Sequence, residues 1–372
     1  MAETVKRIIS IMEKLAPKQD AMKWDNVGLQ VGSEHSQVNR VMVCLDVTKE
    51  VLQEAIEKKV DLIIAHHPMI FSPLKSITRE DHKGYLIHEA IKNDITIYAA
   101  HTNMDIATEG LNSFVAKKIG IEDTDILDIT LREKLYKIAV SVPEGHDEKV
   151  AQALAAAGAG HIGNYSDCSF RSKGTGTFKP LAGTNPFIGK QGELEKVLEI
   201  KIETIVSQAQ LAEAINNMIQ AHPYEEVPYD IYPLENLGKK KGLGKIGKLQ
   251  NPKPLSAFGE ELKSLLQLKQ VKYVGDSDKT LETIGIVCGS GADYIELAAM
   301  KGCDCLITGD VKYHQAQTAL ELGITVIDAG HFETEIFFVD LVFAYLKQQF
   351  SMENMEVEIV APSTEINPFN IL

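Results

Sequence analysis

The sequence has little positive charge relative to its negative charge. Its 372 residues carry 38 lysines and arginines against 52 aspartates and glutamates, a formal net charge of −14 at pH 7. This balance argues against non-specific binding to nucleic acid, because a phosphate backbone needs a basic footprint. It leaves room for a small anionic substrate held by a local site. We therefore expect no nucleic-acid partner.

Long apolar runs and clustered cysteines are also lacking. No stretch approaches the roughly 18 apolar residues of a membrane-spanning helix, and the opening letters MAETVKR lead into an amphipathic pattern without a secretory apolar region. The five cysteines are scattered and odd in number, which suits free thiols in a reducing compartment. Cys303 and Cys305 are too close for a CxxC motif and are interpreted as strand packing. These features predict a cytoplasmic protein without a membrane partner.

The two outer parts of the chain alternate apolar strands with helices. In the first part we expect strands at 40–46, 62–65 and 95–100 and helices at 4–15, 49–59, 84–93 and 110–119. In the last part we expect strands at 284–288, 305–308, 324–328 and 355–360 and helices at 291–301, 314–322 and 334–350. Such alternation is typical of a mostly parallel sheet with helices on both faces.

The middle of the chain has a different pattern. Half-exposed strands are expected at 135–142, 170–178, 198–206 and 227–234, with helices at 147–157 and 209–220. The order β-α-β-β-α-β is that of a ferredoxin-like domain. The fold class is therefore α/β, with two similar three-layer halves that form one core (residues 1–130 and 237–372) around a ferredoxin-like insertion (131–236). The Lys/Gly stretch at 238–247 is interpreted as a solvated connection, and alternatively as a basic anion site.

Three of the expected strands end in residues that commonly bind metals. They are His66 and His67 after 62–65, His101 and Asp105 after 95–100, and His331 and Glu335 after 324–328. Parallel strands of one sheet place their carboxyl ends on the same side, so these side chains are expected to converge. The number of N and O ligands exceeds what one tetrahedral zinc needs, and a carboxylate can bridge. The pattern favours two metals about 3.5–4 Å apart, and the absence of thiolates argues against a structural zinc site.

Spacing supports the same hypothesis. His331 and Glu335 are four residues apart, which puts both on one face of the first turn of a helix. His101 and Asp105 have the same spacing but are expected in a loop. Asp310 and His314 again lie four apart after a strand. They are candidates for orienting ligand imidazoles, the alternative being a helix N-cap and a surface histidine.

Three further features leave alternatives open. The glycines of CGSG (288–291) either let the backbone approach an anion or form a tight strand-to-helix turn. Trp24, the only tryptophan, either stacks on a base in a pocket or packs a corner. His222 is interpreted as part of a helix-to-strand turn rather than as a metal ligand.

Five separated motifs, taken in order, carry a family resemblance. They are WDNVGL (24–29), AHHP (65–68), HTNMD (101–105), TGD (308–310) and GHFETE (330–335). Over both outer parts the chain resembles the GTP cyclohydrolase 1 type 2 homolog family, the Nif-three-like proteins. The middle part resembles the CutA/PII-like domain that longer bacterial members carry, and the phrase HPYE (222–225) is similar to one in CutA.

The resemblance implies a dinuclear metal centre in a toroidal homohexamer. The implied ligands are His66, His67, Asp105, His331 and Glu335. Zinc is the first expectation for the two divalent ions, with iron, manganese and cobalt also compatible.

The family name implies a function. It implies a hydrolase in which metal-activated water opens the imidazole ring of GTP, with a nucleotide or related small molecule as substrate. His101, Asp310 and His314 are then candidates for proton transfer or ligand orientation. The alternative is a non-catalytic metal- or nucleotide-binding scaffold with a regulatory or metal-handling role.

Overall fold

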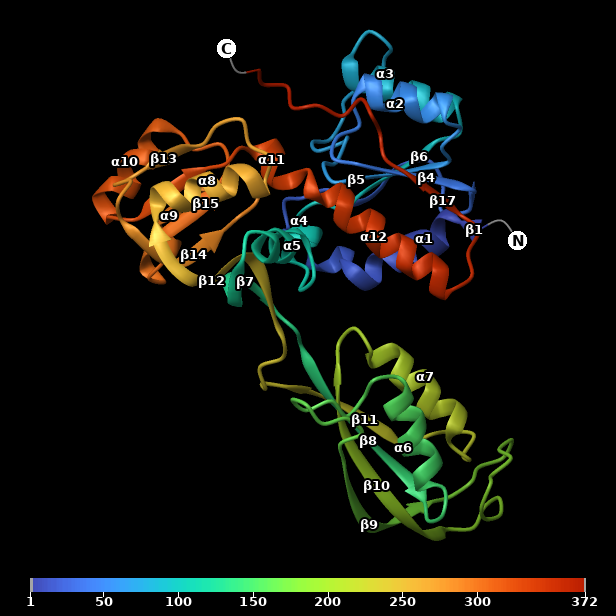
Figure 1. The fold of residues 1–372 in the computed structure, drawn as a ribbon. Helices are drawn as coiled ribbons and strands as arrows, with labels where there is room; N and C mark the ends of the chain where they lie inside the picture. The colour runs from blue at the N-terminus through green and yellow to red at the C-terminus, as the bar shows by residue number, and fades with distance from the viewer. Residues whose placement is uncertain (1–2, 371–372) are drawn as a thin grey trace. The chain divides into compact units, whose positions relative to one another are not determined.

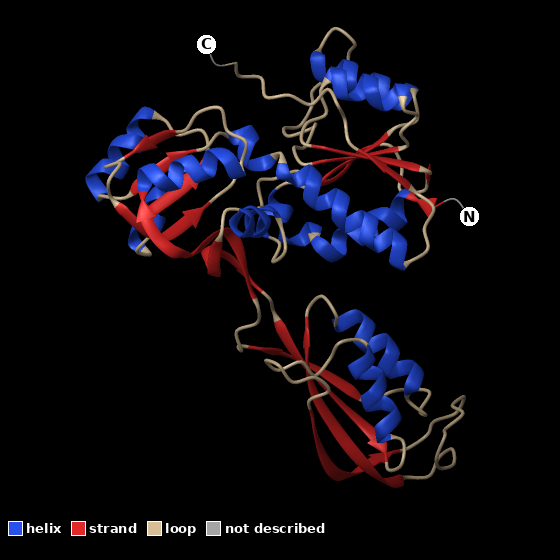
Figure 2. Cartoon of the chain, viewed as in Figure 1, coloured by secondary structure: helices blue, strands red, loops and turns tan. Residues whose placement is uncertain are grey.

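The computed structural model describes residues 3–370, and the chain divides into two compact units. The first contains the residues up to Leu131 and those from Lys241 onward, and the second is Arg132–Lys240. Figure 2 shows that both units mix helices and strands. The predicted mixed α/β architecture with several sheets is confirmed. Within residues 3–370, no helix combines the length and apolarity needed to cross a bilayer.

The first sheet of the first unit is mostly parallel. Its order is β17 (Glu358–Val360), β4 (Arg40–Cys44), β5 (Leu62–Ala65), β6 (Thr96–Ala99) and β2 (Gly28–Val31). β17, β4, β5 and β6 pair in parallel, whereas β2 pairs antiparallel with β6. Two short strands, β1 (Glu3–Thr4) and β3 (Gln37–Val38), pair with each other.

Helices cover both faces of this sheet, which explains why its central strand β5 is apolar at every position. Val41 and Val43 of β4 pack in the cluster that contains α1 (Val5–Leu15) and α12 (Phe337–Met352). Met42 and Cys44 face the opposite way, toward α2 (Lys49–Glu57) and α3 (His82–Lys92). Figure 1 shows the two pairs of helices on opposite sides of the strands. Alternate residues of a strand point to opposite faces, so a sheet covered twice needs continuous apolar runs.

The second sheet of this unit is mixed. Its order is β13 (Lys272–Val274), β16 (Thr325–Asp328), β15 (Cys305–Thr308), β14 (Thr280–Ile286), β12 (Lys240–Pro254) and β7 (Ile121–Arg132). β14, β15 and β16 are parallel, and β13 and β12 add antiparallel pairs. The unit also contains the helices α8 (Leu255–Leu265), α9 (Ile295–Met300) and α10 (Tyr313–Leu322), together with the short 3-10 turns η1 (Lys18–Asp20) and η2 (Ala292–Tyr294).

Again both faces are covered. Ile307 of β15 packs with Phe258 of α8 in one cluster, whereas the adjacent Leu306 packs with Ala298 of α9 and Ala319 of α10 in another. Two short helices follow strand ends, α4 (Thr102–Ile106) after β6 and α11 (His331–Glu335) after β16, and α5 (Leu111–Lys118) follows α4.

The second unit is a four-stranded antiparallel sheet with two helices. The elements are β8 (Leu135–Pro143), α6 (Asp147–Ala156), β9 (Ser169–Phe178), β10 (Glu195–Ser207), α7 (Leu211–Ala221) and β11 (Tyr229–Leu234). The sheet order is β11-β8-β10-β9, with every pair antiparallel. Both helices pack on the same face (Figure 2), where Val140 and Ile202 meet Leu154 and Met218.

Four details differ from the sequence prediction or refine it. The Lys/Gly stretch is not a solvated connection, because most of it lies in β12, whose residues Lys245–Lys248 pair with β14. The polar strand β7 was not predicted. His101 and Asp105 are not in a loop, because Asp105 lies within helix α4 and His101 caps it. His222 forms the C-cap of α7, as the interpretation of a helix-to-strand turn requires.

The strand ends converge from two sheets, not one. β5 and β6 belong to the first sheet, whereas β16 belongs to the second. The premise of a single sheet was therefore wrong, although both sheets contribute carboxyl ends to the same place. The shared hydrophobic cluster, which includes Ile64 of β5 and Ile327 of β16, joins the two sheets beneath that place.

Candidate metal centre

Six side chains with metal-binding atoms meet at these strand ends. They are His66 and His67 after β5, His101 and Asp105 after β6, and His331 and Glu335 of α11. His66, His67 and His101 each offer one nitrogen within a group whose ligand atoms all lie within 4.8 Å of one another. His67, His331 and Glu335 form a second such group. All the predicted ligand positions therefore come together, and His101 lies among them.

Glu335 belongs to the second group and also faces His66 of the first. Its Oε2 is 2.9 Å from His67 Nε2 and 2.9 Å from His331 Nε2. Its Oε1 points the other way and lies 3.7 Å from His66 Nε2. A carboxylate whose two oxygens face different sets of ligands is suited to bridging two cations.

Two buried atoms of the cluster have no hydrogen-bond partner within residues 3–370. They are His66 Nε2 and Asp105 Oδ1, which lie 3.9 Å apart. His66 is completely buried, with 0% exposure. A polar atom buried without a partner costs free energy, so such orphans are rare. One nitrogen and one oxygen with free lone pairs, separated by about the span of a shared ion, fit a divalent metal.

The other ring nitrogen of each histidine is held by a separate acceptor. His66 Nδ1 lies 2.9 Å from the Ala100 carbonyl, His67 Nδ1 2.9 Å from Asp46, His101 Nδ1 3.0 Å from Asp25, and His331 Nδ1 2.7 Å from Asp310. Metal-binding histidines characteristically donate their second N–H to a carboxylate or carbonyl. This arrangement fixes each ring so that Nε2 faces the cluster.

One of these three aspartates was predicted from the sequence and two were missed. Asp310 was a candidate for orienting an imidazole, and it holds His331. Asp46 is the second residue after β4, as His67 is the second residue after β5, so the same strand-end signal could have found it. Asp25 lies in the WDNVGL motif, where nothing in the sequence indicates its contact with His101.

In the metal-free protein, opposite charges in the cluster favour the ionised forms of Glu335, His67 and His331. Glu335 has a pKa well below its usual range, because hydrogen bonds from the histidines outweigh its burial. The contact with Glu335 raises the pKa of His331 to about 9, helped by Asp310 against the effect of burial. Burial acts against protonation of His67, but Asp46 and Glu335 raise its pKa to about 10. Burial raises the pKa of Asp105 to about 6.

One side of the cluster is reachable from solvent. The side chains of His67 and His331 are 23% and 35% exposed, whereas Asp105 and Glu335 are buried. The arrangement combines a buried ligand set with an open approach, which is a feature of catalytic rather than structural metal sites.

Buried polar bridges hold the ligands in place. Asn112 donates to the Asp105 carbonyl at 3.1 Å and accepts from the Cys288 amide at 2.9 Å. The Gly289 amide donates to Thr334 Oγ1 at 2.9 Å. The CGSG segment is thus a tight turn whose Gly289 amide is already used by α11, which favours the turn interpretation over the anion site.

Gly289 provides a prediction about the shape of the site. A Cβ at this position would come within 1.9 Å of Glu335 Oε1, and the residue has a φ of +66°. The substitution Gly289→Ala should therefore displace Glu335 and weaken metal binding by roughly tenfold or more, without removing any ligand. Titration calorimetry with Zn²⁺ measures this.

Gly302→Ala is the matched control for that experiment. Gly302 has a φ of +77°, but a Cβ there meets nothing within 4 Å. It shares the backbone strain and lacks the contact, so its metal affinity should equal that of the wild type. Equal losses in the two variants would show that strain alone, and not the displacement of Glu335, explains the result.

Asp310 provides a second prediction. Asp310→Asn removes the charged acceptor of His331 Nδ1, so metal affinity should fall by roughly 10–100-fold while the fold is retained. Asp293→Asn serves as the control, because Asp293 is an exposed aspartate that accepts from Gln315. The idea that Asp310 supports His331 is refuted if both variants bind metal as the wild type does.

His314 is not brought into the cluster of described residues. It lies exposed on α10, and its Nδ1 is 3.1 Å from Gln317 Oε1. This position matches the alternative of a surface histidine.

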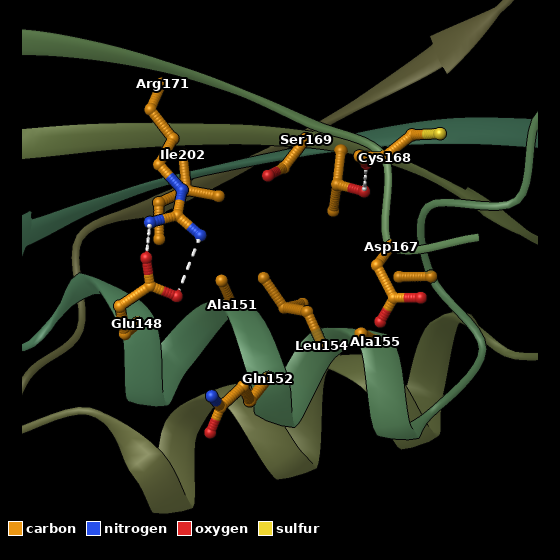
Figure 3. A pocket seen from close by; sticks show the side chains of 12 residues that line it. Glu148, Ala151, Gln152, Leu154, Ala155, Asp167, Cys168, Ser169, Arg171 and Ile202 are labelled. Carbon is orange, nitrogen blue, oxygen red and sulfur yellow. Dashed lines mark hydrogen bonds and ion pairs between the residues drawn. The ribbon is translucent and has the colours of Figure 1, made fainter. Parts of the chain in front are cut away.

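The second unit contains a small hollow of about 110 Å³. It lies between α6 and the sheet, with Leu154 on the helix and Ile202 on β10 (Figure 3). Arg171 at its rim contacts Asp147 at 2.9 Å and Glu148 at 2.6 Å. The guanidinium is thus already paired, and the hollow offers no free positive charge from this residue.

The fold and the cluster define a mixed α/β protein with a His/Glu group that could hold a metal ion. The chain matches the Duf34/NIF3 family (NGG1p interacting factor 3) over residues 3–368. A Bacillus subtilis protein named GTP cyclohydrolase 1 type 2 homolog is 44% identical over 374 residues, which cover 100% of both chains.

Solved structures agree with this match. A Bacillus cereus protein related to NIF3 has a TM-score of 0.94 at 42% identity and covers 100% of both chains. A Staphylococcus aureus protein has a TM-score of 0.78 at 29% identity, covering 100% of this chain and 99% of the other. The chain therefore belongs to the Duf34/NIF3 family, and the resemblance drawn from the five motifs is confirmed.

Proposed function

We propose that the cluster binds two divalent metal ions and that the protein is a metal-dependent hydrolase acting on a nucleotide or a related small molecule. The observation that carries the proposal is the position of Glu335, one of whose oxygens contacts His67 and His331 while the other faces His66. The orphaned Asp105 and His66 atoms supply the ligands that a second ion would need.

The cluster residues would divide between two ions. His66 and Asp105 would hold one ion, and His331 and His67 the other, with Glu335 shared. A metal pair of this kind supplies Lewis-acid polarisation of the substrate and activation of water. Zinc, iron, manganese and cobalt all suit imidazole and carboxylate ligands, and zinc is our first choice.

His101 is the side chain best placed to hold a proton. Burial raises the pKa of Asp25, but hydrogen bonds from His101 and Thr102 outweigh it and lower that pKa. An ionised Asp25 accepts from His101 Nδ1 at 3.0 Å, which leaves Nε2 with a lone pair. His101 therefore either ligates metal or accepts a proton during hydrolysis.

The chemistry of the nearby thiol supports a hydrolytic site. Burial, with the charges of Asp105 and Glu335, raises the pKa of Cys288 well above its usual range. In the metal-free protein Cys288 is thus a neutral thiol, which is a poor metal ligand. A structural zinc site would use thiolates.

The test is an assay of purified, metal-loaded protein against GTP and a panel of phosphoesters and amides. We expect metal-dependent turnover that His66→Ala abolishes, because His66 is wholly buried among the ligands. His35→Ala is the control, since His35 is an exposed histidine outside the cluster. Absence of turnover with every substrate, in protein shown to contain metal, would refute the hydrolase.

The finer architecture and assembly belong to the same proposal. The two sheets of the first unit, from residues 1–130 and 237–372, form one metal-binding core, and residues 131–236 form a CutA/PII-like insertion. The sheet order β11-β8-β10-β9 with two helices on one face supports the insertion. We further propose a toroidal homohexamer in the cytoplasm, which size-exclusion chromatography with light scattering tests.

A second candidate function is a non-catalytic metal- or nucleotide-binding scaffold with a regulatory or metal-handling role. The separate compactness of Arg132–Lys240 favours it, because a hydrolase site complete in the first unit does not need this part of the chain. Thermal-shift measurements with metals and nucleotides, read together with the state of assembly, separate the two. The scaffold is refuted if turnover is robust and binding never alters assembly.

A further inference from the structure

The only tryptophan of the chain is exposed beside another exposed aromatic residue. Trp24 is 59% exposed and Phe71 is 47% exposed. Their ring centroids lie 5.9 Å apart with the planes tilted by 56°. The alternative that Trp24 packs a corner of the fold does not agree with this exposure. Two large aromatic side chains kept together in water indicate a surface that is covered when a partner binds.

This aromatic pair borders the candidate metal centre. The Trp24 ring lies 6.2 Å from the His101 ring, edge to face. The His101 ring in turn lies 5.2 Å from that of His66 and 5.6 Å from that of His67. A ligand that contacts the metal centre from this side therefore meets Trp24 and Phe71 at the same time.

Hydrogen bonds hold together the two segments that carry these aromatic residues. Asn26 donates to the Ile70 carbonyl, Gln30 donates to the Asn26 carbonyl at 2.8 Å, and the Ile70 amide donates to Gln30 at 3.2 Å. The loop carrying Trp24 is thus fixed to the segment carrying Phe71.

The same loop is tied to the metal centre. Asp25, the neighbour of Trp24, accepts from His101, from the Thr102 amide at 3.0 Å and from the Thr102 hydroxyl at 2.5 Å. One carboxylate thus sets both the orientation of His101 and the start of the loop that presents Trp24. The aromatic pair is built as part of the site.

We propose that Trp24 and Phe71 form a subsite for a planar heteroaromatic ring of the small-molecule substrate. The inference rests on the proposed function, because it assumes that a small molecule reaches the metal centre, and it adds the residues that bind the ring of that molecule. Aromatic side chains bind flat rings by offset or edge-to-face stacking. Stacking tolerates many ring types, so the subsite selects for a ring rather than for one base.

Intrinsic fluorescence tests this directly, because Trp24 is the only tryptophan. The metal-loaded full chain is titrated with adenosine, guanosine, cytidine and uridine 5′-monophosphates, and separately with ribose 5-phosphate, which lacks the ring. We expect at least one nucleotide to quench Trp24 and shield it from acrylamide, and ribose 5-phosphate to do neither.

Phe71→Leu removes one wall of the subsite and leaves the fluorophore in place. It should weaken binding of the quenching nucleotide by roughly tenfold, the scale of one lost stacking contact. Phe170→Leu is the matched control, because Phe170 is also exposed, at 69%, but lies in the second unit. Its nucleotide affinity should equal that of the wild type.

Two results would overturn the proposal. One is that nucleotides and ribose 5-phosphate affect Trp24 equally. The other is that Trp24 is already shielded in the ligand-free protein and that Trp24→Leu changes the number of chains in the assembly. This would assign the aromatic pair to contact with a second copy. If turnover is metal-dependent while either result holds, the ring subsite fails and the hydrolase stands. If nucleotides quench Trp24 but no metal binds, the hydrolase fails instead.

Discussion

Glu335→Gln will lower the affinity for divalent metal by at least about 100-fold and will reduce the metal bound per chain to less than one ion. The loss should exceed the 10–100-fold typical of an outer partner, because the proposal makes Glu335 itself a ligand. One of its oxygens contacts His67 and His331, and the other faces His66. Removing a shared carboxylate therefore weakens both halves of the centre at once.

Glu333→Gln is the control for this experiment. Glu333 lies on the same short helix α11, but its carboxylate accepts from Asn367 at 2.7 Å. Zn²⁺ titration calorimetry, together with metal analysis after dialysis, should show wild-type binding for Glu333→Gln. If Glu335→Gln retains one tightly bound ion at unchanged affinity, Glu335 is a ligand of at most one metal and the bridging account is wrong.

Metal affinity will rise steeply with pH between about pH 6 and 7.5. The pKa of His331 is raised to about 9, mainly by Glu335, and Asp46 and Glu335 raise that of His67 to about 10 against its burial. Both imidazoles are therefore protonated in the metal-free protein over this range, and a metal must displace those protons. We expect the affinity to gain up to about 100-fold per pH unit, which corresponds to two protons released.

Calorimetry in buffers of different ionisation enthalpy measures the protons released. His314→Ala should give the same number, because His314 is exposed and contacts Gln317 instead of the cluster. An affinity that is independent of pH over this range would mean that metal binding releases no protons from His67 and His331.

The metal-free protein should show the opposite trend in stability. A histidine whose pKa is raised on folding stabilises the folded state fully below its unfolded pKa of about 6.5. That contribution is lost as the pH rises through 9 and then 10, the values for His331 and His67. In the presence of a chelator, the free energy of unfolding should fall over this alkaline range, and saturating metal should remove much of the fall.

The sequence was most informative where chemistry and local pattern agree. The strand 62–65 is apolar at each position because both faces of its sheet are covered, and the change to His66 and His67 marks its carboxyl end. The same contrast located His331 and Asp310. These residues could be found because a buried strand and its polar end leave a signal within a few neighbouring residues.

What the sequence did not reveal depends on contacts between distant segments. β12 forms from a Lys/Gly-rich stretch because it pairs with β14. The sequence of this stretch has no apolar alternation that would predict the pairing. Asp25 reaches His101 across 76 positions of sequence. The two sheets likewise meet at one site because they share a hydrophobic core. The pattern of any one strand does not predict that core.

Anomalous diffraction from crystals of the metal-loaded protein tests the central claim most directly. The account predicts two anomalous peaks per chain, about 3.5–4 Å apart. One peak should lie against His66 and Asp105 and the other against His331 and His67, with an oxygen of Glu335 on each. A single peak, or peaks away from Glu335, would contradict the account.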